Sequence, residues 1–448
     1  MRFNSNLFLF FLLPMIVVCG HIFRKTDSKK TRIIGVLLLN SLFYLFAGIQ
    51  AFAFVVIYSL VVFFLCKICI IFSYKFLYVL SILILIIPMI ISVFSGRTWS
   101  VLGISFFSFE AITLLIDVIT GRLSEVNIFE VVAYIMFFPV ITSGPICKYT
   151  VLDEGIKQLC YTSTDMELGL MRFVWGLSKK VLIADRFAVI ADYYFNGISR
   201  GDNFSIIGTW AGAISYTIQI YMDFSGYSDM AIGIGKIIGF NIPENFDKPY
   251  SSTTLSEFWQ RWHISLTGWF REYVYIPLGG NRCSVFRHVM NMTVVWMLTG
   301  LWHGVNFTFI IWAAGNLILL IYEKYNSKFA LFMKGKVIGH IYTMLCIVLL
   351  WIPFRCSSVK DMAGYYMGLV GVNNSGSVCE ELILSYLPYI CIIASIALLQ
   401  MLSKEIKNKD GFCGIYTLSV KAFNILCFVL CICVSTNNTY TPYIYGRF

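Results

Sequence analysis

Histidines, acids and tryptophans gather in one stretch of an otherwise apolar chain. Three of the five histidines, His263, His288 and His303, lie between residues 216 and 306. Ionisable side chains are costly at membrane depth, so their concentration in a strongly apolar protein indicates a functional site. We therefore expect this stretch to form the reaction chamber of an enzyme built into a membrane.

His303 is the sharpest candidate for catalysis. It lies in the apolar segment VVWMLTGLWHGVNFTFIIWAAG, where Asn306 three residues on and Thr299 four residues back share its helical face. Gly300 and Gly304 are expected to leave space beside the imidazole. A buried neutral imidazole is an apt general base near neutral pH. The alternative is a histidine that only ties two helices together.

The sequence offers no familiar nucleophile for a covalent mechanism. It has no GxSxG motif, and no Cys–His pair is evident from spacing. A lone histidine base favours transfer from an already activated donor, such as a thioester, to a hydroxyl group. Asn306, Trp302 or backbone amides could hold the oxyanion. Cys66 and Cys69 have CxxC spacing but lie in an apolar helix without further ligands, so no metal site is predicted.

A polar loop and a short helix rich in tryptophan and arginine are predicted to form a wall of the chamber. Thr254 and Glu257 make a capping box that begins the helix. Glu257 and Arg261 are spaced for an i, i+4 ion pair. Trp259 and His263 share that spacing, so the imidazole is expected one turn beyond the indole. His263 is interpreted equally as a site residue and as a structural hydrogen bonder.

The segment MDFSGYSDMAIGIGKIIGF, before that loop, is predicted to pack closely, because small residues let membrane helices approach one another. Asp223 and Asp229 lie six residues apart, which favours capping or pairing, with Asp223 kept as a site-supporting candidate. The charges of GLSKKVLIADR, including Lys180 and Asp185, are expected to reach toward lipid headgroups. His288 is most simply an exposed loop residue.

Composition indicates a polytopic, all-helical membrane protein. The chain has 448 residues, of which 58% are hydrophobic and 13% charged, whereas soluble domains carry roughly 25% charged residues. The net charge of +10 fits basic residues retained in cytoplasmic loops. These residues form no continuous stripe, so no nucleic-acid partner is predicted. We expect one domain over residues 1–448, surrounded by the lipids of the inner (cytoplasmic) membrane.

Apolar runs long enough to cross ~30 Å of hydrocarbon recur along the chain and predict roughly 11 to 13 transmembrane or re-entrant helices. The first run is expected to be an uncleaved span, and Glu110 in the fifth should face protein or water. Pro139, Gly144 and Pro145 should make the sixth run turn back within the bilayer. The candidate runs are residues 7–23, 33–50, 52–72, 76–94, 101–120, 128–146, 168–190, 206–222, 292–322, 337–354, 382–402 and 418–434.

Several of these segments resemble the membrane-bound O-acyltransferase (MBOAT) superfamily. The most similar are DFSGYSDMAIG, PENFDKPYSSTTLSEFWQRWHISLTGWFREYVYIPLGGNR and LTGLWHG, followed by GISFFSFEAITLLIDVITGR, FFPVITSGPICKY, GLSKKVLIADR and the closing YIYGRF. They look most like the bacterial branch of alginate O-acetyltransferase-like proteins, which acetylate polysaccharides. The motif core covers about residues 102–312. The last third matches only loosely, which leaves the acceptor open.

The resemblance implies helices around a central tunnel and an activated donor that enters from the cytoplasm. It implies transfer of an acyl group, usually acetyl, to hydroxyls of an extracytoplasmic polysaccharide. The family's catalytic histidine corresponds to His303 and its second important histidine to His263. No bound cofactor is expected, and the donor is expected to be acetyl-CoA or another thioester. Related systems often complete the transfer with an external protein of esterase fold, which makes such a protein a candidate partner.

Two other functions stay open at this point. One is D-alanyl transfer to teichoic acid in the same fold. The other, from a different class, is a transporter or lipid scramblase in which His303 and the acids form a relay. A transporter often carries paired broken helices in two matching halves, and the sequence has no evident internal repeat.

Overall fold

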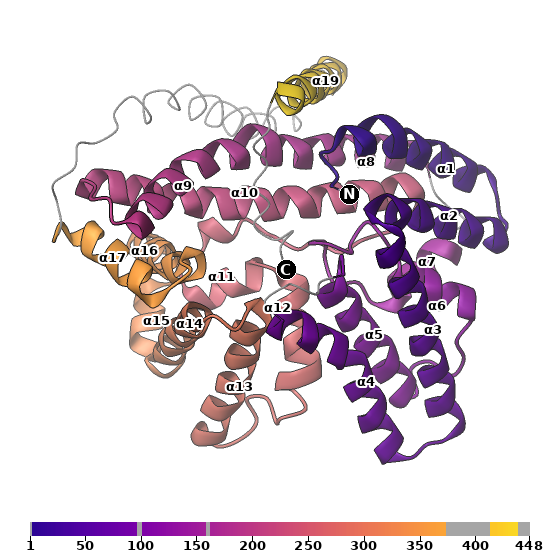
Figure 1. Ribbon diagram of the computed structural model, residues 1–448, viewed down its shortest axis with the longest axis horizontal. Helices are drawn as coiled ribbons and strands as arrows, with labels where there is room; N and C mark the ends of the chain where they lie inside the picture. Colours follow the sequence, from indigo (N-terminus) through magenta and orange to yellow (C-terminus); the bar gives the residue numbers. More distant parts are fainter. Residues whose placement is uncertain (1, 96–100, 158–161, 373–412, 438–448) are drawn as a thin grey trace.

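The computed structural model describes residues 2–95, 101–157, 162–372 and 413–437, and helices form nearly all regular structure there (Figure 1). Within these ranges there is no strand, and one isolated antiparallel bridge joins Phe246 and Trp262. The prediction of an all-helical fold is confirmed.

The first five helices follow the predicted apolar runs closely. Ser28 caps the helix that begins at Lys29, because its side chain accepts a hydrogen bond from Thr31 N at 3.3 Å. Gly48, with φ of +132°, separates this helix from the one that begins at Ile49. These elements are the short π-helix η1 (Phe8–Leu12), α1 (Leu13–Lys25), α2 (Lys29–Ala47), α3 (Ile49–Ile71), α4 (Lys75–Phe94) and α5 (Ile104–Ile119).

The middle of the chain contains the longest helix. It was predicted to end near Met222 but continues to Ile238, and Gly239 ends it with φ of +88°. Its second half holds the glycines and acids that lower the local hydropathy. The elements are α6 (Ile128–Ile135), α7 (Tyr149–Lys157), α8 (Ser163–Ser178), the π-helix η2 (Lys179–Ala184), α9 (Asp185–Arg200) and α10 (Ile206–Ile238).

The remaining elements surround the histidines. The run predicted over 292–322 is divided at Gly304, whose φ is +151°, and the run at 382–402 lies outside the described residues. The elements are η3 (Pro249–Ser251), α11 (Leu255–Arg261), α12 (Ile264–Phe270), η4 (Arg271–Tyr275), α13 (Val285–His303), α14 (Phe307–Tyr325), α15 (Ser327–Met333), α16 (Val337–Arg355), α17 (Val359–Val370) and α19 (Cys413–Asn437).

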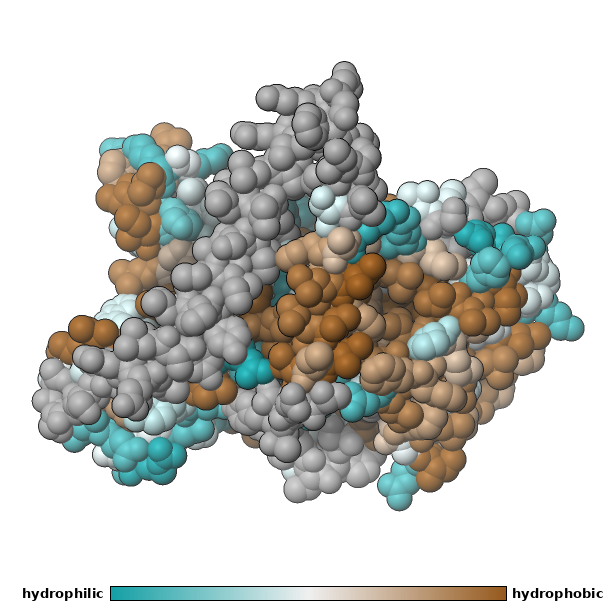
Figure 2. Space-filling view, turned by 90° about the horizontal axis from the view of Figure 1, so that it is seen from above, coloured by the Kyte–Doolittle hydropathy of each residue, from teal (hydrophilic) through white to brown (hydrophobic). Residues whose placement is uncertain are grey.

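Six helices of the described chain are long and apolar enough to cross a membrane: η1 with α1, then α2, α3, α4, α14 and α16. Large apolar side chains are exposed along them, for example Phe64, Phe76 and Ile318. Figure 2 shows such residues gathered on one face of the molecule, with hydrophilic residues mostly toward its edges. Outward apolar side chains belong against lipid, so the protein is a multi-pass membrane protein.

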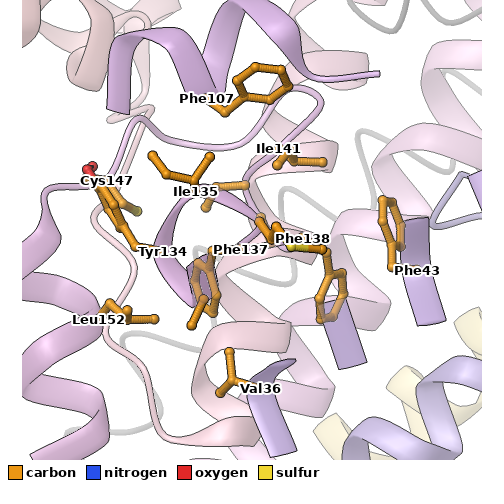
Figure 3. Packing of buried hydrophobic residues seen from close by; sticks show 14 of the residues in the cluster. Val36, Phe43, Phe107, Tyr134, Ile135, Phe137, Phe138, Ile141, Cys147 and Leu152 are labelled. Atoms are coloured by element: carbon orange, nitrogen blue, oxygen red, sulfur yellow. The ribbon is translucent and has the colours of Figure 1, made fainter. Parts of the chain in front are cut away.

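The predicted break after α6 is confirmed. Residues 136–147 form turns without a helix, and all of them are buried. Asn40 of α2 supports this backbone, because its Nδ2 donates to Ala133 O at 3.0 Å and its Oδ1 accepts from Phe138 N at 3.2 Å. Phe43, Phe137 and Ile141 pack around it (Figure 3). Irregular backbone at membrane depth is thus enclosed in protein.

Glu110 of α5 faces protein as predicted, and so does Asp117, the other acid of this helix. Glu110 is buried, and Asp117 pairs with Arg122 at 3.0 Å. The same helix contributes Phe106 and Phe109 to one apolar cluster with Leu266 of α12, so α5 packs beside α12.

Helices α8 and α10 lie side by side (Figure 1) and meet through glycines. A Cβ atom at Gly226 would lie 2.7 Å from Gly176 O, and one at Gly233 would lie 2.6 Å from Gly169 O. The backbones therefore touch, as the small-residue pattern predicts.

A buried ion network joins η2 to α10, and it corrects the expectation that Lys180 and Asp185 reach toward headgroups. Lys180 is 1% exposed, and its Nζ lies 2.8 Å from Asp185 Oδ1 and 2.6 Å from Asp223 Oδ1. Nearby, Asp229 lies 2.6 Å from both Lys179 and Arg172. The pairing role predicted for Asp223 and Asp229 is confirmed.

Breaking this network should destabilise the protein strongly. Lys180→Met leaves two buried carboxylates without their shared cation, which costs about 3–5 kcal/mol for such a loss. We expect a clear fall in the thermal unfolding midpoint in detergent. Arg200→Ala is the matched control, because its pair with Asp202 at 3.1 Å is 65% and 49% exposed and should contribute at most about 1 kcal/mol. Equal midpoints for Lys180→Met and the parent protein would contradict this.

Candidate active site

A cavity of about 350 Å³ lies among α11, α12, η4, α13, α14 and α16. His263 and His303 both line it, together with Trp259 and Thr299. Two residues far apart in sequence therefore meet at one space. The two histidines of the predicted chamber thus line one cavity.

His303 is the last residue of α13, and aromatic rings surround it. It is 4% exposed, and its ring centroid lies 4.6 Å from Trp302, 4.8 Å from Phe354 and 5.2 Å from Trp312. Three sequence-distant segments thus enclose the imidazole in an apolar cage with one side toward the cavity.

The expected space beside His303 is occupied by the next helix. A Cβ atom at Gly300 would lie 2.9 Å from Ala313, and one at Gly304 would lie 2.9 Å from the Phe309 ring. These glycines let α13 and α14 pack closely. The expectation that they leave space beside the imidazole is wrong.

Asn306 does not accompany His303, contrary to the prediction. Since α13 ends at His303, the i, i+3 spacing has no helix to act through. Asn306 instead begins α14, accepting from Thr308 N at 3.3 Å and donating to Ser357 O. It does not line the cavity.

His263 lies between α11 and α12 in a left-handed backbone conformation, with φ of +46°. The helix predicted to carry both Trp259 and His263 ends before it, so their i, i+4 relation is wrong, although both side chains line the cavity. The Phe224 ring meets the imidazole edge-on at 4.6 Å. A non-glycine residue at positive φ costs free energy and persists only where surrounding contacts enforce it.

Asn245, in the loop after α10, supplies those contacts. Its Oδ1 accepts from Ser265 Oγ at 2.8 Å and from Ser265 N at 3.2 Å, and it lies 3.2 Å from His263 Nδ1. Its Nδ2 donates to Ser228 Oγ at 3.3 Å. Because Oδ1 can only accept, the Nδ1 atom of His263 carries the proton. Asn245 is not among the predicted site residues, and its only signal in the sequence is its place in the PENF motif.

The state of His263 follows from this environment. The residue lies in the α11–α12 connection, outside the six candidate spans. Burial lowers its pKa to about 3, so the imidazole is neutral at pH 7. With Nδ1 protonated, Nε2 is a hydrogen-bond acceptor, and within the described part of the chain no group donates to it.

Helix α11 is capped differently from the prediction. Thr254 Oγ1 accepts from Glu257 N at 3.1 Å as expected, but the Glu257 carboxylate accepts from Thr253 N at 2.8 Å. Glu257 also pairs with Arg261 at 2.8 Å, which confirms that ion pair. Neither of them lines the cavity. Both instead stabilise α11, the helix that contributes Trp259 to the cavity lining.

Trp259, Trp302 and Asp223 complete the predicted set. The Trp259 indole lines the cavity and donates to Asn316 Oδ1 at 3.0 Å. Trp302 lies between the two histidines, 6.4 Å from the His263 ring centroid. Asp223 belongs to the Lys180 network and is not a lining residue. Among the described residues no three His, Cys, Asp or Glu side chains are grouped as a metal site.

His288 is buried, and the prediction of an exposed loop residue is wrong. It lies in the first turn of α13, is 6% exposed, and its Nδ1 is 2.6 Å from Tyr325 Oη. It lines the cavity together with Arg271 and Lys324. These three residues were not predicted as site residues.

Removing Asn245 should destabilise the α11–α12 connection. Asn245→Ala leaves the half-buried Ser265 donors and the buried His263 donor without their acceptor, at a cost of about 1–3 kcal/mol. We expect a lower thermal unfolding midpoint in detergent, and no change for Asn281→Ala, whose side chain is exposed. Identical midpoints for Asn245→Ala and the parent protein would show that Asn245 does not hold the connection.

The depressed pKa of His263 should make stability depend on pH. An unfolded histidine takes up a proton near pH 6.5, while the folded residue stays neutral to about pH 3. The stabilisation is therefore complete above pH 6.5 and is lost toward pH 3, by up to about 1.4 kcal/mol per pH unit. Unfolding midpoints measured from pH 7.5 to 5 should fall more steeply in the parent protein than in His263→Gln. Equal slopes of midpoint against pH in the two proteins would refute the lowered pKa of His263.

The sequence has clear relatives. The model of the membrane-bound O-acyltransferase family matches residues 120–352. A probable alginate O-acetylase of Pseudomonas aeruginosa is 36% identical over 69% of this chain and 60% of its own length. The peptidoglycan O-acetyltransferase of Helicobacter pylori is 36% identical over 60% of this chain and 51% of its own length. The teichoic acid D-alanyltransferase of Bacillus subtilis is 31% identical over 51% of this chain and 61% of its own length.

The aligned part therefore spans between half and about three fifths of each of these relatives. The family match, in contrast, takes in more than half of this chain, including α10, both histidines and the cavity walls. On this match, the chain belongs to the membrane-bound O-acyltransferase family.

Proposed function

We propose that the protein is an O-acyltransferase that moves an acyl group, most simply acetyl, to hydroxyl groups of an extracytoplasmic polysaccharide. The donor is a cytoplasmic thioester such as acetyl-CoA, and the protein acts in the inner membrane. The acceptor receives the group directly or through an external partner of esterase fold. The observation that carries this proposal is the meeting of His263 and His303 at one cavity.

The relatives support the same chemistry. Three of them are named for acetylation of alginate, acetyl transfer to peptidoglycan and D-alanyl transfer to teichoic acid. No other reaction class is suggested by their names. The aromatic and aliphatic lining of the cavity suits such a reaction, because it keeps water from competing with the acceptor hydroxyl.

In the proposed step, the acceptor hydroxyl oxygen attacks the thioester carbonyl carbon. The new C–O bond forms, the C–S bond breaks, and the hydroxyl proton passes through an imidazole to the leaving thiolate. A base with a pKa near 3 takes up a proton poorly at pH 7, so His263 is unsuited to that transfer. We assign proton transfer to His303 and orientation of the acceptor to Nε2 of His263, which can accept the hydrogen bond of its hydroxyl.

Loss of the His303 imidazole should abolish acyl transfer. We expect cells carrying His303→Ala to lack the acetyl ester of their surface glycans, measured by mass spectrometry of the isolated polymer. His340→Ala is the matched control, since His340 lies outside the cavity lining. Both variants must accumulate in the membrane at the parent level. Unchanged ester content in His303→Ala would remove the catalytic assignment.

D-Alanyl transfer is the second candidate, favoured by the relative from Bacillus subtilis. It uses the same attack on an activated carbonyl and differs only in the group moved. Labelled alanine supplied to the cells decides between them. Label in the envelope that depends on His303 would support alanyl transfer, and acetyl ester without such label would support acetylation.

A further inference from the structure

The segment between α14 and α16 lies at one surface of the membrane. These two helices are consecutive candidate spans, so residues 326–336 connect them without crossing the bilayer. Helix α15 lies in this connection, beside both of them (Figure 1). The connection carries Lys328, Lys334 and Lys336, and no acid occurs between residues 324 and 360. By the positive-inside rule this surface is the cytoplasmic one.

Residues 326–338, which we call the strap, expose apolar and basic side chains together. All five residues from 334 to 338 are exposed, and Val337 and Leu331 reach 78% and 75% exposure. Lys336 Nζ lies 4.2 Å from the ring centroid of Phe332, which is also exposed. Segments that combine outward apolar groups with lysines lie in the headgroup layer, where the apolar groups enter the lipid and the ammonium groups stay in water.

The positive charges of the strap are not neutralised by the protein. In the described part of the chain no carboxylate forms an ion pair with Lys328, Lys334 or Lys336. Glu323, the acid just before the strap, is buried, and its carboxylate accepts from the first two amides of α11 at 2.8 and 3.0 Å. Basic residues that keep their charge at a membrane surface attract anionic lipid.

The inward side of the strap is attached to α11, a wall of the cavity. Gly335 N donates to Thr253 Oγ1 at 3.2 Å, and a Cβ atom at Gly339, just after the strap, would lie 2.8 Å from Thr253 O. Thr253 N in turn donates to the Glu257 carboxylate of α11 at 2.8 Å. Both ends of the strap are therefore joined to the first turn of α11, the helix that brings Trp259 to the cavity.

We infer that the strap binds the headgroups of anionic phospholipid through Lys328, Lys334 and Lys336, while its apolar side chains enter the leaflet. The ammonium groups donate to phosphodiester oxygens, which accept strong charge-assisted hydrogen bonds. Through its two attachments the lipid-bound strap stabilises the first turn of α11, and with it one wall of the cavity. The inference goes beyond the proposed acyl transfer, because it holds whatever group the protein moves.

Binding is tested with the full-length protein in neutral detergent, to which phosphatidylglycerol or phosphatidylcholine is added. Native mass spectrometry counts the retained lipids and gives their Kd. We expect Kd for phosphatidylglycerol to rise about fivefold for each of Lys328→Gln, Lys334→Gln and Lys336→Gln, and Kd for phosphatidylcholine to stay constant. Lys360→Gln is the matched control, because Lys360 is exposed beyond the other end of α16, at the opposite membrane surface. The same phosphatidylglycerol Kd in the triple variant and the parent would overturn the site.

The effect on α11 is tested by hydrogen exchange in nanodiscs. Compared with discs of phosphatidylcholine alone, phosphatidylglycerol in the disc should slow exchange of the α11 amides in the parent protein and in Lys360→Gln. The triple variant should lose this difference, because lipid no longer holds its strap. A general effect of the charged bilayer would act on all variants equally. Equal protection of α11 in the triple variant would therefore contradict the link between strap and cavity wall.

Two other anionic ligands are distinguished in the same experiment. Glycerol phosphate in phosphatidylcholine discs carries the headgroup charge without acyl chains, and an acidic acyl carrier protein is the macromolecular alternative. We expect neither to slow exchange in α11. Protection by glycerol phosphate in place of phosphatidylglycerol would indicate a site for soluble phosphate, and protection by the carrier protein would indicate a protein-docking surface. Either result would overturn the lipid assignment.

Discussion

The architecture of the site depends on how polar backbone is satisfied where a helix is interrupted. Between α10 and α13 the chain forms short helices joined by loops, and the backbone groups at each helix end need partners from outside that helix. Asn245 meets this need, because its single amide binds Ser228 on one side and Ser265 and His263 on the other. Ser265 Oγ then accepts from Ile146 N at 3.0 Å, which ties the turns after α6 to the same point.

The buried charges follow a related constraint. Lys180 is enclosed between Asp185 and Asp223, and the cost of removing all three from water is offset only because they contact one another closely. Such a network gives little net stability but resists sliding of η2 along α10, since any shift would separate the charges. A backbone contact between Gly176 of α8 and Gly226 of α10 lies beside this network. Helix α10, which leads into the loop with Asn245, is thus held against both α8 and η2.

Local sequence patterns predicted the helices well and the side-chain contacts unevenly. Apolar runs located α1 to α4 because hydropathy alone decides whether a segment can face lipid. The same criterion placed the end of α10 too early, because the glycines and acids of its second half suit a protein interior and not a lipid surface. His288 and Asn245 could not be placed, because burial of His288 depends on Tyr325 and the role of Asn245 on three separate segments. The prediction that Asn306 shares the helical face of His303 failed because the helix ends before Gly304, so helical spacing does not relate the two residues.

The two histidines have different surroundings, which agrees with the different roles proposed for them. A hydrogen bond from Nδ1 fixes the His263 ring and leaves Nε2 able only to accept, so this residue can position a hydroxyl without holding its proton. His303 is held by aromatic contacts with Trp302, Trp312 and Phe354, which restrict the ring by shape. In the proposed mechanism His303 transfers the proton from this aromatic surrounding at the cavity, whereas His263 only orients the acceptor hydroxyl.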